Sequence, residues 1–244
     1  MNEPSIEIEV IPVLEDNFEY LICWPGGVAV VDPAVAAPIR TRLEAHKIRL
    51  THIFLTHDHG DHIAGVAELQ KMYGAEIIAP AGAKLFPENL RAGMPASLFL
   101  NGGEKLEFSG LRVEAIPTPG HCAAHIAFFL PDAKAVFTGD CLFGAGCGRL
   151  FGNPPEIMFQ SLRLLAALPD ETRVFFGHEY TVSNLRFART IEPENDAIAR
   201  RLADAEKNLP TSPSTIALEK ETNVFLRARD AAEFAMRRFR KDHF

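Results

Sequence analysis

The sequence predicts an α/β protein, with a mixed α/β domain at residues 1–179 followed by a smaller, mainly helical domain at residues 180–244. Two observations support this division. Up to residue 179, short apolar runs are separated by turns rich in Pro and Gly and by segments with helical spacing, as when strands alternate with helices. From about Tyr180, Arg and Glu become more frequent and helical spacing dominates as far as Asn208. A chain of 244 residues is long enough for one large domain with a small appendage.

Each expected element has a local reason. Residues 6–10 alternate apolar and acidic side chains, as a half-buried strand does, and the apolar runs 20–24 and 28–31 flank a Pro-Gly-Gly turn that predicts a hairpin. The wholly apolar run 53–55 predicts a strand buried on both faces. Gly74 closes a helical segment at 63–73, and Pro154 with Pro155 opens another that reaches residue 168. Further strands are expected at 77–79, 105–108, 113–116, 126–130, 135–138 and 174–176, and further helices at 38–46, within 181–208 and at 230–240.

Composition disfavours several classes of function. The net charge of -7 argues against a nucleic-acid-binding surface, and no apolar run approaches the ~20 residues that a membrane span needs. The first four residues are acidic overall and lack the apolar core of a signal peptide. The four cysteines form no Cys-x-x-Cys pair and fit reduced thiols better than a disulfide framework. We therefore expect a cytoplasmic, monomeric protein that acts on neither nucleic acids nor membranes.

The most informative segment is Thr-His-Asp-His-Gly-Asp-His at residues 56–62, directly after the apolar run 53–55. Imidazole and carboxylate groups are ligands that zinc, iron and manganese accept. His57 and His59 would point the same way in extended backbone and could hold one ion, whereas the neighbours Asp61 and His62 diverge and could reach a second. The alternative is a helix N-terminus capped by Asp58 or Asp61, but a cap uses one carboxylate and accounts for no histidine.

Three later motifs offer one possible ligand each, and each lies where an apolar strand meets a turn containing Gly. They are Thr-Pro-Gly-His at 118–121, Thr-Gly-Asp at 138–140 and Phe-Gly-His at 176–178. Two metal ions that share a carboxylate would use the whole set, and Asp140 is the candidate for the shared ligand. His125 is left over and is expected to form hydrogen bonds behind the ligands. The predicted ligands are His57, His59, Asp61, His62, His121, Asp140 and His178.

These seven residues, in this order, resemble the metal-binding motifs of the metallo-β-lactamase superfamily. Within it the chain is most similar to the glyoxalase II (hydroxyacylglutathione hydrolase) group. This narrower resemblance rests on Asp-Asn-Phe-Glu-Tyr-Leu-Ile at 16–22, Gly-Asp-Cys-Leu-Phe at 139–143, Gly-Cys-Gly-Arg-Leu-Phe at 146–151, His-Glu-Tyr at 178–180 and Arg238-x-x-Lys241-Asp242-x-Phe244. It implies a four-layer αβ/βα sandwich with the metals at one edge between two sheets, and a helical C-terminal addition.

The resemblance also implies a substrate, a thioester of glutathione, chiefly S-D-lactoylglutathione, which yields D-lactate and glutathione. By position, Arg149, Phe151, Tyr180, Arg238 and Lys241 would contact the glutathione part, although Phe151 stands where the group often has Tyr and so can pack without donating a hydrogen bond. The residues themselves favour an anionic ligand, because residues 225–244 carry six Arg or Lys against three acidic residues. The alternative for this basic tail is a solvated helix end that complements the helix dipole.

The mechanism expected from these residues needs no Ser-His-Asp set. A hydroxide held between two divalent ions, zinc or else iron or manganese, would attack the thioester carbonyl, and Asp61 would orient it as the catalytic residue. The nearest alternative is a persulfide dioxygenase of the same superfamily with a single iron. Three other functions fit less well. β-Lactamases of the superfamily usually lack a carboxylate such as Asp140, and an acidic chain argues against a nuclease. A non-catalytic metal-binding module would not be expected to have a complete ligand set.

Overall fold

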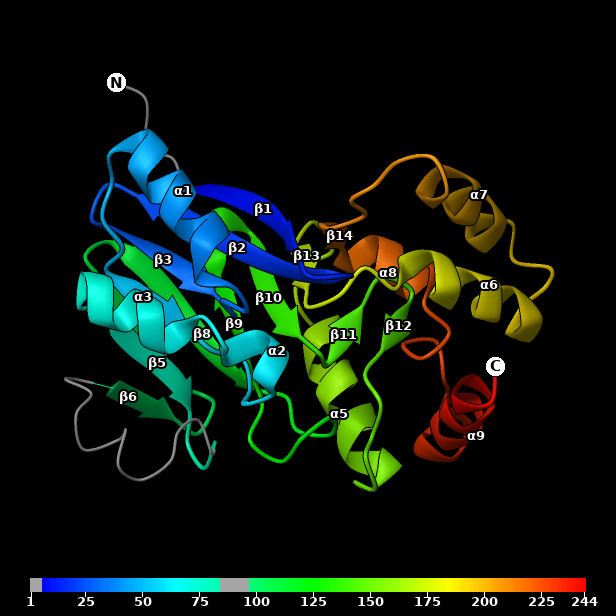
Figure 1. Ribbon diagram of the computed structural model, residues 1–244. Helices are drawn as coiled ribbons and strands as arrows, with labels where there is room; N and C mark the ends of the chain where they lie inside the picture. The colour runs from blue at the N-terminus through cyan, green and yellow to red at the C-terminus, as the bar shows by residue number, and fades with distance from the viewer. Residues whose placement is uncertain (1–5, 84–96) are drawn as a thin grey trace.

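The structure, a computed structural model, describes residues 6–83 and 97–244, so the acidic start of the chain lies outside the described residues. Two sheets are stacked face to face, and helices cover their outer sides (Figure 1). The arrangement is the expected αβ/βα sandwich, with further helices from the C-terminal part of the chain gathered at one end.

The first sheet has the strand order β1-β2-β3-β4-β5-β6 in the described residues. Its first three strands are antiparallel, and β3 to β6 run parallel. The predicted hairpin is confirmed, because Trp24 pairs with Gly27 across the turn. The bounds are β1 (Glu7–Val13), β2 (Asn17–Trp24), β3 (Gly27–Val31), β4 (His52–Phe54), β5 (Glu76–Pro80) and β6 (Ser97–Leu100).

The second sheet has the order β14-β13-β10-β9-β8-β7 in the same part of the chain. Only β10 and β13 pair in parallel, and the other neighbours are antiparallel. A separate two-stranded hairpin, β11 (Leu142–Phe143) with β12 (Gly146–Cys147), follows β10 directly. The bounds are β7 (Lys105–Phe108), β8 (Leu111–Pro117), β9 (Ile126–Leu130), β10 (Ala135–Gly139), β13 (Arg173–Phe176) and β14 (Ser214–Thr215), with a 3-10 turn at Pro131–Ala133 between β9 and β10.

Alternation along the strands divides the core. Phe54 of β4 points inward and stacks on Phe128 of β9, whereas its neighbour Ile53 points outward. The outward residues of the first sheet pack against α1 (Ala36–His46) and α3 (Val66–Tyr73). Strand β4 is therefore buried on both faces, as its apolar sequence predicted.

In Figure 1 the helices of residues 181–242 lie toward the right-hand side, and the helix of residues 155–166 lies below the β11–β12 hairpin. Asp230 caps the last helix of the chain by accepting a hydrogen bond from the Glu233 backbone N–H at 2.8 Å, which places the start of that helix where the sequence predicted it. The bounds are α5 (Pro155–Ala166), α6 (Thr181–Ile191), α7 (Asp196–Ala205), α8 (Ile216–Thr222) and α9 (Ala231–Asp242).

Two of the predicted helical segments differ in detail from the structure. The helix predicted at 63–73 is α3, which begins three residues later, at Val66, and ends at Tyr73 as predicted; a separate short helix that was not predicted, α2 (Gly60–Ile63), precedes it, and the Gly65 N–H between the two donates to Pro33 O at 2.9 Å. The segment 181–208 divides into α6 and α7 at Pro193, which lacks a backbone N–H, and Asn195 then caps α7. The short elements β6, β11, β12, β14 and α8 were not predicted.

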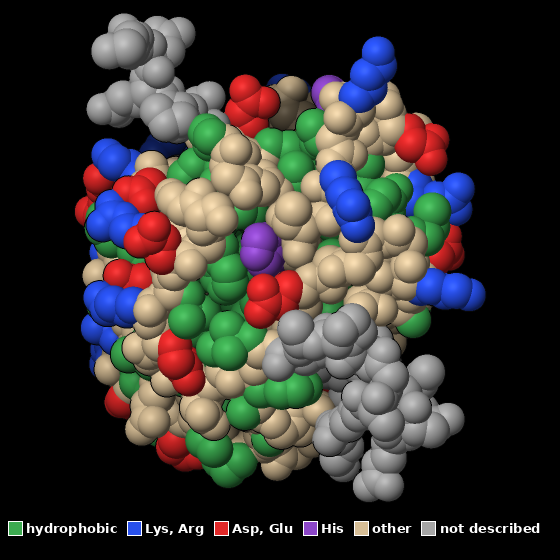
Figure 2. Space-filling model, turned by 90° about the vertical axis from the view of Figure 1, so that its left-hand side faces the viewer, with side chains coloured by type: hydrophobic (Ala, Val, Ile, Leu, Met, Phe, Trp, Pro, Cys, Tyr) green, Lys and Arg blue, Asp and Glu red, His purple; other side chains and the backbone are tan. Residues whose placement is uncertain are grey.

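Charges on the surface are mixed in sign. Figure 2, which views the side of the molecule at the left of Figure 1, shows acidic and basic side chains interspersed over much of that face. One pair joins the helices there, with Arg40 Nη1 of α1 2.9 Å from Glu68 Oε1 of α3. Within residues 6–83 and 97–244, no helix combines the length and apolar character needed to cross a membrane.

Candidate active site

Four segments bring the predicted ligands to one edge of the sandwich. Residues 57–62 follow β4, His121 lies in the loop between β8 and β9, Asp140 follows β10, and His178 follows β13. Because β10 and β13 are parallel neighbours, their carboxyl ends meet at this edge. All seven predicted ligands are thereby brought together.

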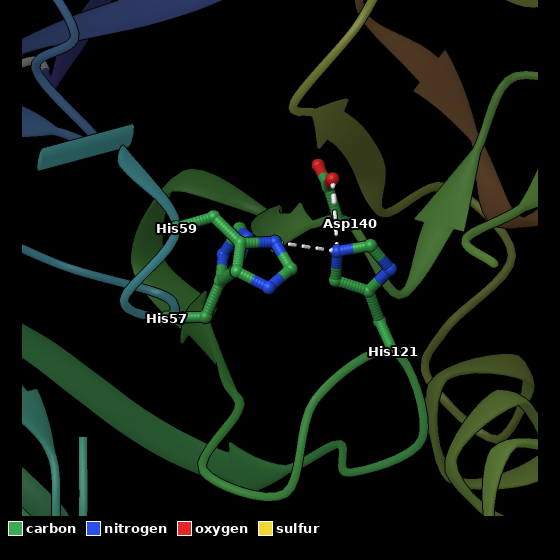
Figure 3. A group of neighbouring side chains, drawn as sticks. All are labelled: His57, His59, His121 and Asp140. Atoms are coloured by element: carbon green, nitrogen blue, oxygen red, sulfur yellow. Dashed lines mark hydrogen bonds and ion pairs between the residues drawn. The ribbon is translucent and has the colours of Figure 1, made fainter. Parts of the chain in front are cut away.

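The first group contains His57, His59, His121 and Asp140, and their ligand atoms lie within 4.8 Å of one another. His59 Nδ1 is 2.9 Å from His121 Nε2, and Asp140 Oδ2 is 3.3 Å from the same nitrogen (Figure 3). The side chains come from opposite sides of the gap and their polar atoms converge on one another (Figure 3).

The second group contains Asp61, His62 and His178. The two Nε2 atoms of His62 and His178 are 3.2 Å apart, and Asp61 Oδ2 is 3.4 Å from His178 Nε2. Asp140 also reaches this group, because its Oδ1 is 3.3 Å from His62 Nε2 and its Oδ2 is 3.5 Å from His178 Nε2. Asp140 therefore contacts members of both groups, which also meet where His57 and His62 lie close together beside Asp32.

Two buried atoms test whether these residues suit metal ions. Among the described residues, His57 Nε2 and Asp140 Oδ1 are buried and make no hydrogen bond. Leaving such atoms unmatched is costly, unless a ligand takes up their lone pairs. The spacing also fits, because ligand atoms about 2.0–2.2 Å from a tetrahedral ion stand roughly 3.4 Å apart. The cluster, in this fold, implies divalent metal ions.

The electrostatics give His57, His121 and Asp140 the protonation states that metals require. Burial lowers the pKa of His57 well below its usual value and also lowers that of His121, so both rings are neutral with a lone pair available. Burial alone would raise the pKa of Asp140, but the charge of His62 and the hydrogen bonds from His178 and His62 together outweigh it and hold that pKa well below the usual range. Asp140 is therefore ionised at neutral pH. Burial alone would lower the pKa of His62 and His178, but the carboxylate of Asp140 raises both, so these two rings must lose a proton when a metal binds.

Each imidazole of the second group is oriented by a carboxylate that was not predicted from the sequence. Asp16 Oδ1 lies 2.8 Å from His178 Nδ1, and Asp32 Oδ2 lies 3.1 Å from His62 Nδ1. Asn17 holds Asp61 by donating to its Oδ2 at 3.2 Å and its backbone O at 3.0 Å. Such contacts fix which ring nitrogen faces a metal. Asp32 directly follows strand β3, just as several predicted ligands follow strands, so its position in the sequence could have identified it as part of the site.

His125 has the role that the sequence suggested. Its Nδ1 lies 2.8 Å from Thr118 Oγ1, and its Nε2 accepts from the Asp140 backbone N–H at 3.3 Å. Burial lowers its pKa to about 3, so the ring is neutral.

The alternative interpretation of residues 56–62, a helix N-terminus capped by Asp58 or Asp61, is wrong. The N-cap residue of α2 is His59, and no side chain caps this helix.

A cleft of about 710 Å³ opens from the ligand cluster toward the C-terminal helices. Five of the predicted ligands line one part of it, including His59, Asp61 and His178. All five residues predicted to contact the substrate line it as well: Arg149, Phe151, Tyr180, Arg238 and Lys241.

The aromatic residues of the cleft pack on the ligands. The Tyr180 ring stacks on His178 at 4.9 Å, and burial raises its pKa to about 12, so its hydroxyl stays protonated. Phe151, 69% exposed, sets its ring edge to face with His121 at 5.2 Å and with His59 at 5.9 Å. Phe151 also has a φ of 44°, an uncommon conformation for a bulky residue.

The basic residues of the cleft differ in their exposure and in the hydrogen bonds they already make within the protein. Arg149 is exposed. Lys241 Nζ donates to Ser183 Oγ at 3.0 Å, and burial together with the charge of Arg238 lowers its pKa to about 8. Arg238 is buried, with Nη1 donating to Cys147 O at 2.9 Å and Nη2 to Asp242 at 2.8 Å, so its guanidinium is already held by the protein.

Comparisons with known proteins agree with this site. Residues 19–178 match the family model of the metallo-beta-lactamase superfamily, and residues 179–244 match that of the hydroxyacylglutathione hydrolase C-terminus. The hydroxyacylglutathione hydrolase of Ruegeria pomeroyi is 43% identical over 260 residues, covering 98% of this chain and 99% of that protein.

Solved structures share the fold. ETHE1 from Myxococcus xanthus has a TM-score of 0.72 at 24% identity, covering 96% of this chain and 90% of that one. TTHA1623, crystallised in a di-iron-bound form, has a TM-score of 0.63 at 26% identity, covering 90% of this chain and 99% of that one.

Proposed function

Because the chain belongs to the metallo-beta-lactamase superfamily and, within it, to the hydroxyacylglutathione hydrolases, we propose that it hydrolyses thioesters of glutathione, chiefly S-D-lactoylglutathione to D-lactate and glutathione. The observation that carries the proposal is the cleft itself. It joins the ligand cluster to basic and aromatic residues of the region matched by the C-terminal family model. If the thioester carbonyl of the substrate lies at the ligand cluster, its glutathione part extends along this cleft.

We assign one metal ion to His57, His59 and His121 and a second to Asp61, His62 and His178, with Asp140 shared. The two groups of convergent ligand atoms support this assignment, as does the contact of Asp140 with both. The di-iron-bound form of TTHA1623 supports a pair of ions in this fold. His and Asp ligands suit zinc, with iron or manganese as alternatives, and metal analysis decides among them.

Divalent ions bound at these ligands would supply hydroxide at neutral pH by lowering the pKa of water, and would polarise the thioester carbonyl. Asp61 is the residue of this chain placed to orient the attacking water and to take its proton. Burial alone would raise the pKa of Asp61, but His62 and the hydrogen bond from Asn17 lower it, so the carboxylate is ionised. Its side chain is 46% exposed to the cleft. When the C–S bond breaks, the sulfur leaves as the glutathione thiolate, for which no general acid is required.

The substrate side of the cleft suits the glutathione part, which has two carboxylates and one ammonium group. Arg149 and Lys241 are cations that line the cleft, and each can donate to a carboxylate. Tyr180 offers a hydroxyl, whereas Phe151 offers only ring surface. Arg238, already bound to Cys147 and Asp242, would contribute its positive field and the shape of the wall. We thus assign substrate binding to residues 180–244 together with the segment 149–151.

The alternative, a persulfide dioxygenase with a single iron, predicts a different result when the same sample is assayed. We would purify the protein, count bound metals, and measure both thioester hydrolysis and oxygen uptake. Hydrolysis of S-lactoylglutathione with about two ions per chain supports the proposal. Oxygen uptake with a glutathione persulfide, one iron per chain and no hydrolysis would replace it. The monomeric state and the cytoplasmic location stay predictions of the sequence.

A further inference from the structure

The β11–β12 hairpin lies beside the ligands, and the hairpin and its flanking residues contact one ligand of each group. Asp140 precedes its first strand, and the carbonyl of Arg149, just beyond its second strand, is 2.9 Å from His121 Nδ1. The Phe143 ring packs edge to face on His178 at 5.9 Å. A displacement of this hairpin would therefore move ligands of both groups.

The turn of the hairpin has an uncommon conformation. Ala145 has a φ of 53°, in the left-handed region where a side chain is unfavourable. Such conformations persist when surrounding contacts hold them. The backbone N–H of Ala145 donates to Glu219 Oε2 at 2.8 Å, and Asn223 Nδ2 donates to Gly146 O at 3.0 Å. Both holding residues come from α8 and the residue just after it, 74 residues further along the chain in the case of Glu219.

Glu219 is completely buried, and both of its carboxylate oxygens accept hydrogen bonds. Its Oε1 accepts from Arg201 at 2.6 Å and from Ser214 Oγ at 2.5 Å. Its Oε2 accepts from Ala145 N and from Asn223 Nδ2 at 3.0 Å. A carboxylate has about four lone-pair sites, so these donors match its capacity. A glutamine of the same shape would offer an oxygen on one side only, and its NH₂ would face donors on the other.

We propose that Glu219 is a positioning residue for the metal centre: the C-terminal region holds the strained β11–β12 turn through Glu219, and the hairpin in turn holds His121 and His178. The C-terminal region thus has a second task besides binding substrate. The inference rests on the proposed function for its reaction, but its first readout, the retention of metal ions, needs no substrate.

The test compares Glu219→Gln with Arg201→Met in the full-length, metal-loaded protein. Both substitutions disturb the same buried ion pair, whose side chains are 0% and 8% exposed, but only Glu219 contacts the hairpin. We would measure melting temperature, the rate of metal release to a chromogenic chelator, and kcat and KM for S-lactoylglutathione, at a temperature where both variants are folded.

Contacts behind metal ligands are typically worth about 10–100-fold in affinity or activity. Glu219→Gln should therefore release metal at least about tenfold faster and lose kcat by a similar factor, with KM changed little. Arg201→Met should lose thermal stability but keep both rates within about twofold of the parent.

Rescue gives the sharper test. Glycine adopts a positive φ without steric cost, so Ala145→Gly makes the turn less dependent on Glu219. Adding Ala145→Gly to Glu219→Gln should restore a substantial part of metal retention and kcat, and should do nothing for Arg201→Met. If Glu219→Gln does not fold, Asn223→Ser replaces it, since that variant removes the donor to Gly146 without altering a buried charge. The proposal is overturned if the hairpin variant releases metal no faster than Arg201→Met, or if Ala145→Gly leaves a folded Glu219→Gln unimproved. Failure of S-lactoylglutathione hydrolysis with intact metal retention in the parent would instead refute the proposed function.

Discussion

Gly177→Ala should disable the site with little change to the fold. Gly177 lies between β13 and His178, and its backbone hydrogen bonds to Gly139 O and from Phe18 N at 2.9 Å hold it in place. A Cβ added there would lie 2.8 Å from His62 Cε1 and closer still to Asp140 Oδ1. Carbon atoms in contact are about 3.5–4.0 Å apart, so the ligands must retreat by about 0.7 Å or more. The position is therefore reserved for glycine by the metal centre itself.

The expected magnitudes follow from that displacement. A misplacement of about 1 Å can lower turnover by about 10²-fold, and overpacking costs about 1–3 kcal/mol of unfolding free energy. We would measure kcat, metal content and denaturant unfolding of the variant. Gly60→Ala is the matched control, because Gly60 belongs to the same metal motif but a Cβ there meets nothing within 4 Å. Parent-like turnover and metal content in Gly177→Ala would show that His62 and Asp140 do not hold metal from these positions.

Three other predictions address the metals and the substrate. Asp140→Ala should weaken binding of both ions by at least about 10–100-fold, so retention of both ions at near-normal turnover would remove its shared role. Lys241→Ala should raise KM more than it lowers kcat, by about tenfold to a hundredfold for a full charge-assisted bond and by less where solvent screens Lys241, and a thioester without glutathione should be insensitive to the change. Arg238→Ala should raise KM by less than that and should also lower the melting temperature, because the buried guanidinium is bound to Cys147 O and Asp242. Because the pKa of Lys241 is lowered to about 8, its charge is present below that pH and lost above it, so KM should rise as pH passes through 8, and Lys241→Arg should abolish the rise.

The ligand set was predictable because its signals are local. Residues 57–62 form one contiguous motif, and Asp140 and His178 each follow an apolar strand beside a glycine. Parallel pairing of β10 and β13 then brings the last two together. The fold was predictable for similar reasons, since short apolar runs bounded by turns and helix caps such as Asp230 are local features.

What the sequence did not predict depends on contacts between distant segments. Asp16 and Asn17 were noted only as part of the motif at 16–22, with no role assigned to either. They reach His178 and Asp61 because the end of β13 packs beside the start of β2, where Phe18 N donates to Gly177 O. The two-residue strands β11 and β12 carry no periodicity, and Glu219 reads as a surface acid until its burial is known. Arg238 was predicted as a substrate contact from a motif that gives no view of Cys147 and Asp242, which hold its guanidinium.

The most direct test of the account is the hydrolysis of S-lactoylglutathione by the purified protein, with metal ions counted in the same sample and a thioester of the same acyl group on a thiol other than glutathione as the control substrate. We expect about two ions per chain, a kcat/KM of at least about 10⁴ M⁻¹s⁻¹ for the glutathione thioester, and a control at least about tenfold slower. Absence of hydrolysis by the metal-loaded protein, or equal rates on the two thioesters, would contradict the assignment of this cleft to glutathione thioesters.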